Sequence, residues 1–408
     1  MARYDLAVMG VDLGGLSCAA LLSSKGRKPV VFGRGPDLAT SIGGLTYSGF
    51  SFAPGPALHT APRAGGTMDQ LFADIKAGTV AAEEAGGFQV ALPDRRISLA
   101  RNRERWRDEL KREFAQDRQH LERFFRDLDR LAAKIAKGRI AAFFAKRKSA
   151  AALLRRYAFS RELQAFFALL SRFFQRMPPE HAALDEFVDM LLRPPSRAYG
   201  QRVTVATRLM ETILKNGGEV RFGDGVDEVL PRSRRFEVKA ASGSLDADTV
   251  LLSQPDARQS VLYAGIQETV IPVGMGNDVI YLPDYAKPDE FLSLSLSDEK
   301  EASSAPSGAR ALTCVFNGME ASLPKEEMIR LVGRLMPFLS DFIVVSEVVP
   351  DVPQARIPQD VHFKSVHSGV GGAVLFQGTI KGIYRIAEDR LASGKQIRAA
   401  RRLMKKIS

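Results

Sequence analysis

A glycine-rich turn near the N-terminus, GVDLGG at 10–15, has the residue types and spacing to hold a phosphate group. It follows a short apolar run at 4–9 and precedes a segment in which Leu16, Ala19 and Ala20 recur at helical spacing. An apolar run that ends at glycine is typical of a buried parallel strand, and the N–H groups at a helix start bind anions. The spacing therefore predicts a strand, a phosphate-binding turn and a helix.

A second apolar run, PVVF at 29–32, completes a βαβ unit, with Gly26 closing its helix. The remaining patterns predict helices over 102–192, at Val205–Lys215 and at Glu326–Met336. Strands are predicted at VRF, FEVKA, TVLLS and IVVSEVV, and several more within 270–318. One basic helix is predicted from Gly378 to the end. Together they predict an α/β fold of two or three domains, as 408 residues would suggest.

Three further segments accompany the turn in a fixed order: IGGLTYSGFSFAPGPALH (42–59), GGEVRFGDGVDEVL (217–230) and FEVKAASGSLDADTVLLSQPDA (236–257). This ordered set resembles the FAD-dependent oxidoreductases of the phytoene desaturase, carotenoid isomerase and amine oxidase type, over residues 4–400. The resemblance implies a Rossmann-type FAD/NAD(P)-binding domain, a mixed-sheet substrate domain and a helical insert. It assigns 1–75, 200–258 and 360–408 to the first, 76–100 and 259–359 to the second, and 101–199 to a basic helical insert.

The same resemblance implies which positions would lie against FAD. These are Gly10, Asp12, Gly14, Gly15, Gly33, Arg34, Gly43, Gly44 and Val226. It also places His59 near the flavin and substrate, where a structural histidine is the alternative. No residue declares itself as an acid or base, so no catalytic residue is assigned.

Four positions depart from the family's pattern. Asp12 replaces the second glycine of the turn, and at about 4 Å its charge would repel a diphosphate by several kcal/mol. Gly33 replaces the acidic residue that binds the ribose, and Leu45 replaces an arginine after the paired glycines. The stretch at 367–382 lacks the expected Gly-Asp motif.

The retained positions are those that the fold needs, and the altered ones are those that the cofactor needs. Two functions follow: FAD-dependent redox chemistry on an apolar substrate such as an isoprenoid, or a flavin-free pseudoenzyme that serves as a lipid-binding, scaffold or partner protein. We also expect Arg34 to form an ion pair with Asp12, because both would flank the phosphate-binding turn.

The net charge of +11 is concentrated in two segments. Residues 101–156 hold 18 Lys and Arg against 8 Asp and Glu, and residues 381–408 hold 9 against 2. Within 130–161 there are ten cationic residues, no acidic residue, and interleaved aliphatic and aromatic residues. This pattern suits a solvated helix face or an anionic membrane surface; nucleic acid ranks third, since no recognition motif accompanies the charge. The candidate membrane contacts are Lys134, Lys137, Arg139, Lys146, Arg147 and Lys148.

Cysteine and histidine usage limits the remaining chemistry. Two cysteines, Cys18 and Cys314, exclude a disulfide framework and indicate a reducing cytoplasm, with a peripheral position at the inner face of a membrane as an extension. The five histidines show no metal-ligand spacing, so no metal is expected. The N-terminus lacks the pattern of a signal peptide, and no apolar run is long enough to cross a bilayer.

Overall fold

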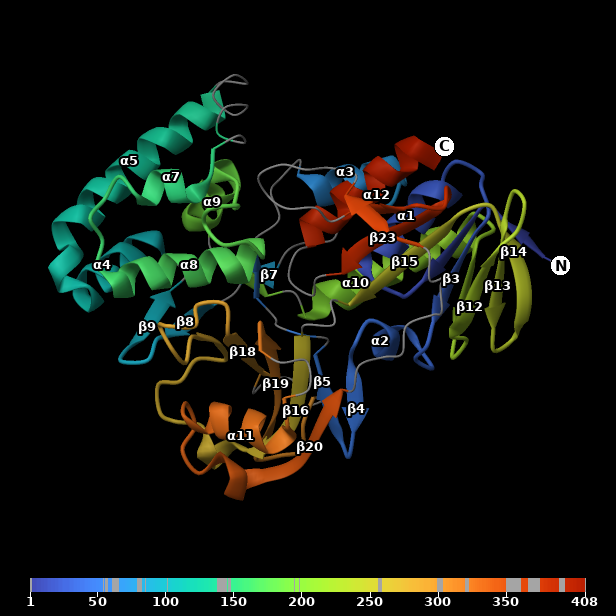
Figure 1. Cartoon of the computed structure of the whole chain (residues 1–408). Coiled ribbons are helices and arrows are strands. Elements are labelled where there is room, and N and C mark those ends of the chain that lie inside the picture. Colours follow the sequence, from blue (N-terminus) through green and yellow to red (C-terminus); the bar gives the residue numbers. More distant parts are fainter. Residues whose placement is uncertain are drawn as a thin grey trace.

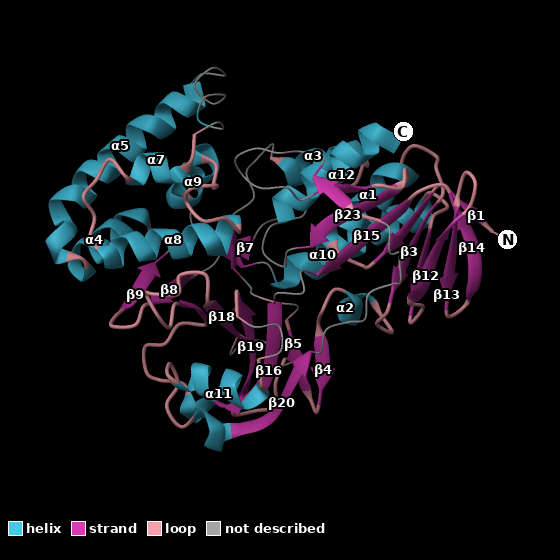
Figure 2. Ribbon diagram, viewed as in Figure 1, coloured by secondary structure: helices cyan, strands magenta, loops and turns pink. Residues whose placement is uncertain are grey.

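The computed structural model describes residues 2–53, 55, 58–60, 66–78, 83–84, 86–100, 102–137, 145, 148–193, 195–197, 199–255, 259–298, 304–319, 323–349, 361–365, 375–388 and 393–407. These form two seven-stranded sheets and a group of helices, which occupy the right, the bottom and the upper left of Figure 1. Figure 2 shows how helices and strands separate into these parts. The predicted α/β class with a Rossmann-type sheet, a mixed sheet and a helical insert is confirmed.

The first sheet takes its strands from both ends and the middle of the chain. Its order is β11 (Glu219–Phe222), β3 (Pro29–Gly33), β2 (Leu6–Met9), β15 (Val250–Pro255), β23 (Ile383–Glu388), β22 (Leu375–Gly378) and β21 (Phe363–Ser365). The first five strands are parallel to their neighbours, and the last two are antiparallel. Every residue of β2 and β3 is buried, because both faces of the sheet are covered.

Helices cover one face of this sheet and a small four-stranded sheet covers the other. The helices are α1 (Leu13–Ser23), α3 (Thr67–Asp74), α10 (Tyr199–Lys215) and α12 (Ser393–Ile407). The opposite layer contains β1 (Arg3–Tyr4), β14 (Gly243–Ala247), β13 (Phe236–Ala240) and β12 (Val226–Pro231). Helix α1 is buried from Gly14 to Ser23, since α12 and α10 pack on the sides that the sheet leaves open (Figure 1).

The second sheet is mixed and carries the middle of the chain. Its order is β20 (Ile343–Val349), β16 (Gln259–Gln267), β19 (Ala309–Asn317), β18 (Phe291–Leu296), β17 (Asp278–Tyr281), β8 (Gly87–Ala91) and β9 (Arg96–Ala100). Helix α11 (Lys325–Gly333) packs on one face. The hairpin of β4 (Leu45–Tyr47) and β5 (Phe50–Phe52) packs against β16 and β19. A small sheet of β6 (Leu58–Thr60), β10 (Pro195–Arg197) and β7 (Glu83–Glu84) completes the strands.

The helical insert has an aromatic core of its own. It contains α4 (Arg103–Glu113), a 3-10 turn (Ala115–Asp117), α5 (Arg118–Lys137), α7 (Ala150–Leu154), α8 (Arg161–Gln175) and α9 (Leu184–Leu192). Phe124 lies within 5.6 Å, between ring centroids, of Phe125, Tyr157, Phe159 and Phe167. No described helix of the protein is both long and apolar enough to cross a membrane.

The prediction of a single basic helix from Gly378 onward is wrong for its first part. Residues Ile383–Glu388 form strand β23, which pairs with β15 and β22, and the helix begins at Ser393. The strand forms because Ile383 and Ile386 are buried in the first sheet, where β23 pairs with β15. Strand β15 lies more than a hundred residues earlier in the sequence. Two cations of α12 form ion pairs with other elements: Arg398 with Glu186 at 2.8 Å and Arg401 with Asp74 at 2.9 Å.

Both cysteines are expected to be unreactive in the folded protein. Cys18 lies on α1 and Cys314 on β19, both fully buried, and burial raises the pKa of each thiol. For Cys18 the nearby charge of Asp12 raises the pKa further. We expect an aromatic disulfide reagent at pH 8 to modify neither thiol in the native state and both after unfolding in urea. Rapid labelling of native protein would contradict the packing of α1.

Candidate functional site

Asp12 caps helix α1 at the position where a dinucleotide fold holds phosphate. Its backbone is extended, its side chain is only 3% exposed, and its Oδ1 accepts a hydrogen bond of 2.8 Å from the Gly15 N–H. A carboxylate at this place satisfies a free N–H group and interacts favourably with the helix dipole. The side chain of Asp12 therefore makes a contact that a bound diphosphate would otherwise make.

Gly10 and Gly15 are required by the packing of α1 on the sheet. Gly10 has φ of +113°, and a Cβ there would lie 1.7 Å from the carbonyl oxygen of Ser253 on β15. A Cβ on Gly15 would lie 2.7 Å from Cγ1 of Val8. Gly14 is buried within α1. These glycines thus have structural reasons to be present whether or not a cofactor binds.

The end of β3 is closed around Gly33. A Cβ on Gly33 would lie 2.7 Å from Ser41 Oγ, 2.8 Å from Val11 Cγ2 and 3.0 Å from Phe222 Cδ1. Ser41 ends the short helix α2 (Leu38–Ser41), and Phe222 ends the edge strand β11. An acidic side chain, which the resemblance requires here for the ribose, would meet atoms from three directions.

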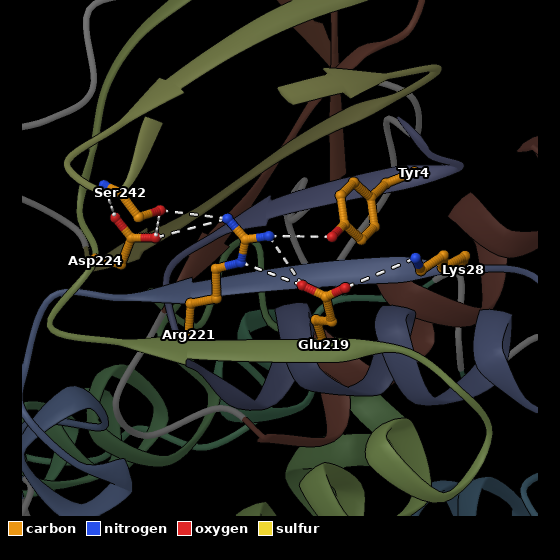
Figure 3. Close-up of polar contacts among 6 residues, drawn as sticks. All are labelled: Tyr4, Lys28, Glu219, Arg221, Asp224 and Ser242. Atoms are coloured by element: carbon orange, nitrogen blue, oxygen red, sulfur yellow. Dashed lines mark hydrogen bonds and ion pairs between the residues drawn. The ribbon is translucent and has the colours of Figure 1, made fainter. Parts of the chain in front are cut away.

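A polar network centred on Arg221 fixes strand β11 beside β3, as Figure 3 shows. The Arg221 guanidinium contacts Glu219 at 2.9 Å and donates to Tyr4 Oη at 3.1 Å and Ser242 Oγ at 3.3 Å. Asp224 lies 3.9 Å from Arg221 and accepts hydrogen bonds from the backbone and hydroxyl of Ser242. The network joins β11 to the four-stranded layer and so keeps Phe222 against Gly33.

The charges within this network favour the ionised form of the Glu219 carboxyl group. Burial alone would raise the pKa of Glu219, but hydrogen bonds from Tyr4 and Arg221 and the charges of Arg221 and Lys28 hold it below its ordinary value. Lys28 Nζ lies 3.7 Å from Glu219 Oε1 (Figure 3). The cations here are matched by carboxylates, so the network serves the fold and leaves no excess charge for a ligand phosphate.

The expected ion pair between Arg34 and Asp12 is not formed. Arg34 is exposed, and its guanidinium donates to the carbonyl oxygen of Val226 at 3.3 Å. Its aliphatic part packs on Gly225, where a Cβ would lie 3.1 Å from Arg34 Cγ. Asp12 is instead directed into the start of α1. Arg34 thus contacts Val226, another position that the resemblance assigns to the cofactor.

The paired glycines and Leu45 fasten the β4–β5 hairpin to the second sheet. Gly43 has φ of +95°, and its carbonyl accepts a hydrogen bond from the Tyr263 hydroxyl. A Cβ on Gly44 would lie 2.9 Å from the Ala39 carbonyl oxygen. Leu45, at the place of the family's arginine, packs against the apolar cluster that contains Phe52 and Tyr263.

Several predicted positions cannot be placed in the site. Outside the described residues lie the side chain of His59, residues 367–374 of the stretch 367–382, and the cations Arg139, Lys146 and Arg147. Lys134, Lys137 and Lys148 are exposed in the helical insert and belong to a different part of the molecule. Among the residues that the structure describes, no group of three or more His, Cys, Asp or Glu side chains could hold a metal ion.

The sequence did not reveal three residues that pack against Gly10 and Gly33 although they are distant in the chain. Ser253, Ser41 and Phe222 lie on three separate elements and carry no local motif. Phe222 alone had a signal, since it ends the predicted strand VRF. Their proximity to the turn follows from the order of strands in the sheet.

Three positions lack the side chains that would bind FAD in the ordinary dinucleotide mode. The Gly15 N–H in the first turn of α1 donates to the Asp12 carboxylate. Gly33 provides no carboxylate for the ribose, and Leu45, at the arginine position, packs against an apolar cluster.

The capping role of Asp12 gives a direct prediction. Replacement Asp12→Ala removes the acceptor for Gly15 N–H and is expected to lower the free energy of unfolding by about 1 kcal/mol. Asp12→Ser keeps a capping oxygen and is the matched control, with an expected loss of only a few tenths of a kcal/mol. Urea denaturation monitored by circular dichroism measures both. Equal stability of the wild type and Asp12→Ala would show that the cap contributes nothing.

Comparison with solved structures supports the fold independently of these contacts. An oxidoreductase from Methanosarcina mazei superposes with a TM-score of 0.61 at 14% identity, covering 99% of this chain and 100% of its own. Cyclohexylamine oxidase from Brevibacterium oxydans superposes with a TM-score of 0.53 at 12% identity, and the match covers 99% of this chain and 98% of the oxidase. RAB GDI from Plasmodium falciparum superposes with a TM-score of 0.56 at 10% identity, and the match covers 100% of this chain and 97% of RAB GDI.

At the level of sequence, no protein-family model and no curated protein matches the chain. The similarity to solved structures extends over essentially the whole chain but at identities of 14% or less. Such values establish an architecture and leave the activity to be argued from the site. The chain has the fold of the FAD-dependent oxidoreductases.

Proposed function

We propose that this chain uses the FAD-oxidoreductase fold without a flavin and acts as a binding or partner protein. The observation that carries the proposal is the hydrogen bond from Gly15 N–H to the Asp12 carboxylate. A diphosphate at this helix start would have to displace that carboxylate or lie beside its negative charge. The packed corner at Gly33 and the apolar contact of Leu45 support the same interpretation.

The ligand class that we propose is an apolar small molecule or a lipid. The support comes from the resemblance to desaturases and carotenoid isomerases, which implies a substrate domain for residues 76–100 and 259–359. A scaffold role is the alternative within this proposal. Extraction of the purified protein with organic solvent, followed by mass spectrometry, would identify an apolar ligand that copurifies with it.

FAD-dependent redox chemistry on an apolar, isoprenoid-like substrate is the second candidate. It is favoured by the fold similarity to solved proteins that are named as an oxidoreductase and as cyclohexylamine oxidase. In this case the flavin would supply hydride or electron transfer, and the protein would supply orientation and an apolar environment. The candidate requires Asp12 to give up its capping contact when FAD binds.

The absorption spectrum and an FAD titration distinguish the two candidates. We expect a colourless purified protein and no heat of binding when FAD is added in a calorimeter. The Asp12→Gly variant, which removes the competing carboxylate, is expected to bind FAD more tightly than the wild type. A yellow wild-type protein with one flavin per chain would overturn the flavin-free proposal and establish the second candidate.

A further inference from the structure

Helix α5 carries a continuous row of exposed cations on the side that faces away from the protein. Arg123, Arg126, Arg130, Lys134 and Lys137 are all exposed and follow one another at spacings of three or four residues. At 100° per residue they share an arc of about 80°, and at 1.5 Å per residue the row is about 20 Å long. We call these five residues the α5 row. In Figure 1 α5 forms the outer edge of the helical insert.

The opposite face of α5 explains why the row points outward. Leu121, Phe124, Phe125 and Leu128 are buried in the core of the insert, and Leu131 and Ile135 pack against that core. An amphipathic helix whose apolar stripe is used inside the domain must present its other face to the surroundings. The direction of the α5 row is therefore fixed by the aromatic core.

Acidic residues on α5 do little to balance this charge. Asp129 is held by Arg103 and Arg107 of α4, and Glu122 lies near Arg118 at 3.9 Å. Asp127 accepts a hydrogen bond of 2.8 Å from the Tyr157 hydroxyl and lies 3.5 Å from Arg130. Of the acidic residues on α5, only Asp127 thus forms an ion pair with a described member of the row.

Further cations extend the charged surface. Arg155 and Arg156 follow α7 and are exposed.

The structure also corrects the basis of the membrane prediction. The aliphatic and aromatic residues that alternate with cations after Lys148 are not exposed: Leu153, Leu154, Tyr157 and Phe159 all belong to the core. They cannot insert into a bilayer in this fold. A contact through the described part of this surface therefore lacks apolar anchoring by these four residues.

We propose that the α5 row docks the protein onto the surface of an anionic lipid bilayer. A straight row of cations on a convex edge matches a flat, negatively charged surface, and each cation near such a surface strengthens binding roughly fivefold. The aromatic side chains of α5 face inward, so the row offers no surface for stacking nucleic acid bases. The inference does not depend on whether the chain binds a flavin.

Flotation with lipid vesicles tests the proposal on the full chain. The variant Arg123→Gln/Arg126→Gln/Lys134→Gln removes three exposed cations for which the structure shows no ion pair. The matched control Lys25→Gln/Arg234→Gln/Lys381→Gln removes three exposed cations from the part of the molecule that contains the first sheet. Both variants change the net charge equally, and circular dichroism verifies that both are folded.

We expect the wild type to float with vesicles of phosphatidylcholine and phosphatidylglycerol but not with phosphatidylcholine alone, and binding to weaken between about 50 and 500 mM salt. The α5 variant is expected to bind about 100-fold more weakly, and the control within about threefold of the wild type. Equal binding by both variants would overturn the proposal. So would binding to neutral vesicles, or binding of duplex DNA that needs the α5 row while anionic vesicles are ignored.

Discussion

A Gly10→Ala variant is expected to lose most of the stability of the first sheet, with a decrease of about 4 kcal/mol or more in the free energy of unfolding. Two effects combine at this position. The backbone has φ of +113°, which strains any L-residue, and the added methyl would lie 1.7 Å from the backbone oxygen of Ser253. Because the obstructing atom is backbone in the central strand β15, no side-chain rotation can relieve the contact. Urea denaturation, or loss of soluble protein, measures the effect.

Gly26→Ala is the matched control for backbone strain. Gly26 also has a positive φ, +76°, but no atom lies within 4 Å of a Cβ built there. We therefore expect a loss of only about 1 kcal/mol from the strained backbone alone. If the two variants were equally stable, the close approach of Gly10 to β15 would be wrong, and the glycine would need another explanation.

A Phe159→Ala variant is expected to destabilise the helical insert by about 3–5 kcal/mol. The Phe159 ring is 5% exposed and lies 5.5 Å from Phe124, 5.3 Å from Tyr157 and 5.6 Å from Phe167, between ring centroids. Removing it would leave a cavity that the surrounding rings cannot fill. Thermal and urea unfolding measure the loss, and hydrogen exchange would assign it to the insert.

The control for this prediction is an exposed aromatic residue. Phe338 is 75% exposed beside the second sheet, so Phe338→Ala is expected to change stability by less than about 0.5 kcal/mol. Should Phe159→Ala leave stability unchanged but reduce binding to vesicles, the residue would contact lipid and its assignment to the core would be refuted.

The contacts around the glycine-rich turn explain why the fold itself requires its glycines. Gly10 and Gly15 remain because the strand and helix approach one another too closely for a side chain. Asp12 and Leu45 can differ from the family's pattern because each has a partner within the chain. A motif of this kind is therefore informative about packing, whether or not a ligand binds.

Local structure was largely predictable. The βαβ unit follows from two apolar runs and one helical segment, and β2, α1 and β3 lie where those patterns placed them. Helix α10 begins at Tyr199, earlier than the predicted start at Val205, since helix starts depend on tertiary contacts that sequence periodicity does not report. Strand β23 was missed, because its partner β15 is distant in sequence.

The sequence by itself determined the α/β class, the glycine-rich turn with Asp12 at its centre, and the concentration of positive charge in two segments. Only the tertiary structure decided that the Asp12 carboxylate accepts from Gly15, that Arg34 reaches Val226 and not Asp12, and that Gly33 is enclosed by Ser41 and Phe222. It also decided which side chains of the basic segment face outward and which form its core. The physical reason is that strand pairing and helix packing join residues far apart in sequence, and those partners determine whether a charge or a cavity remains available to a ligand.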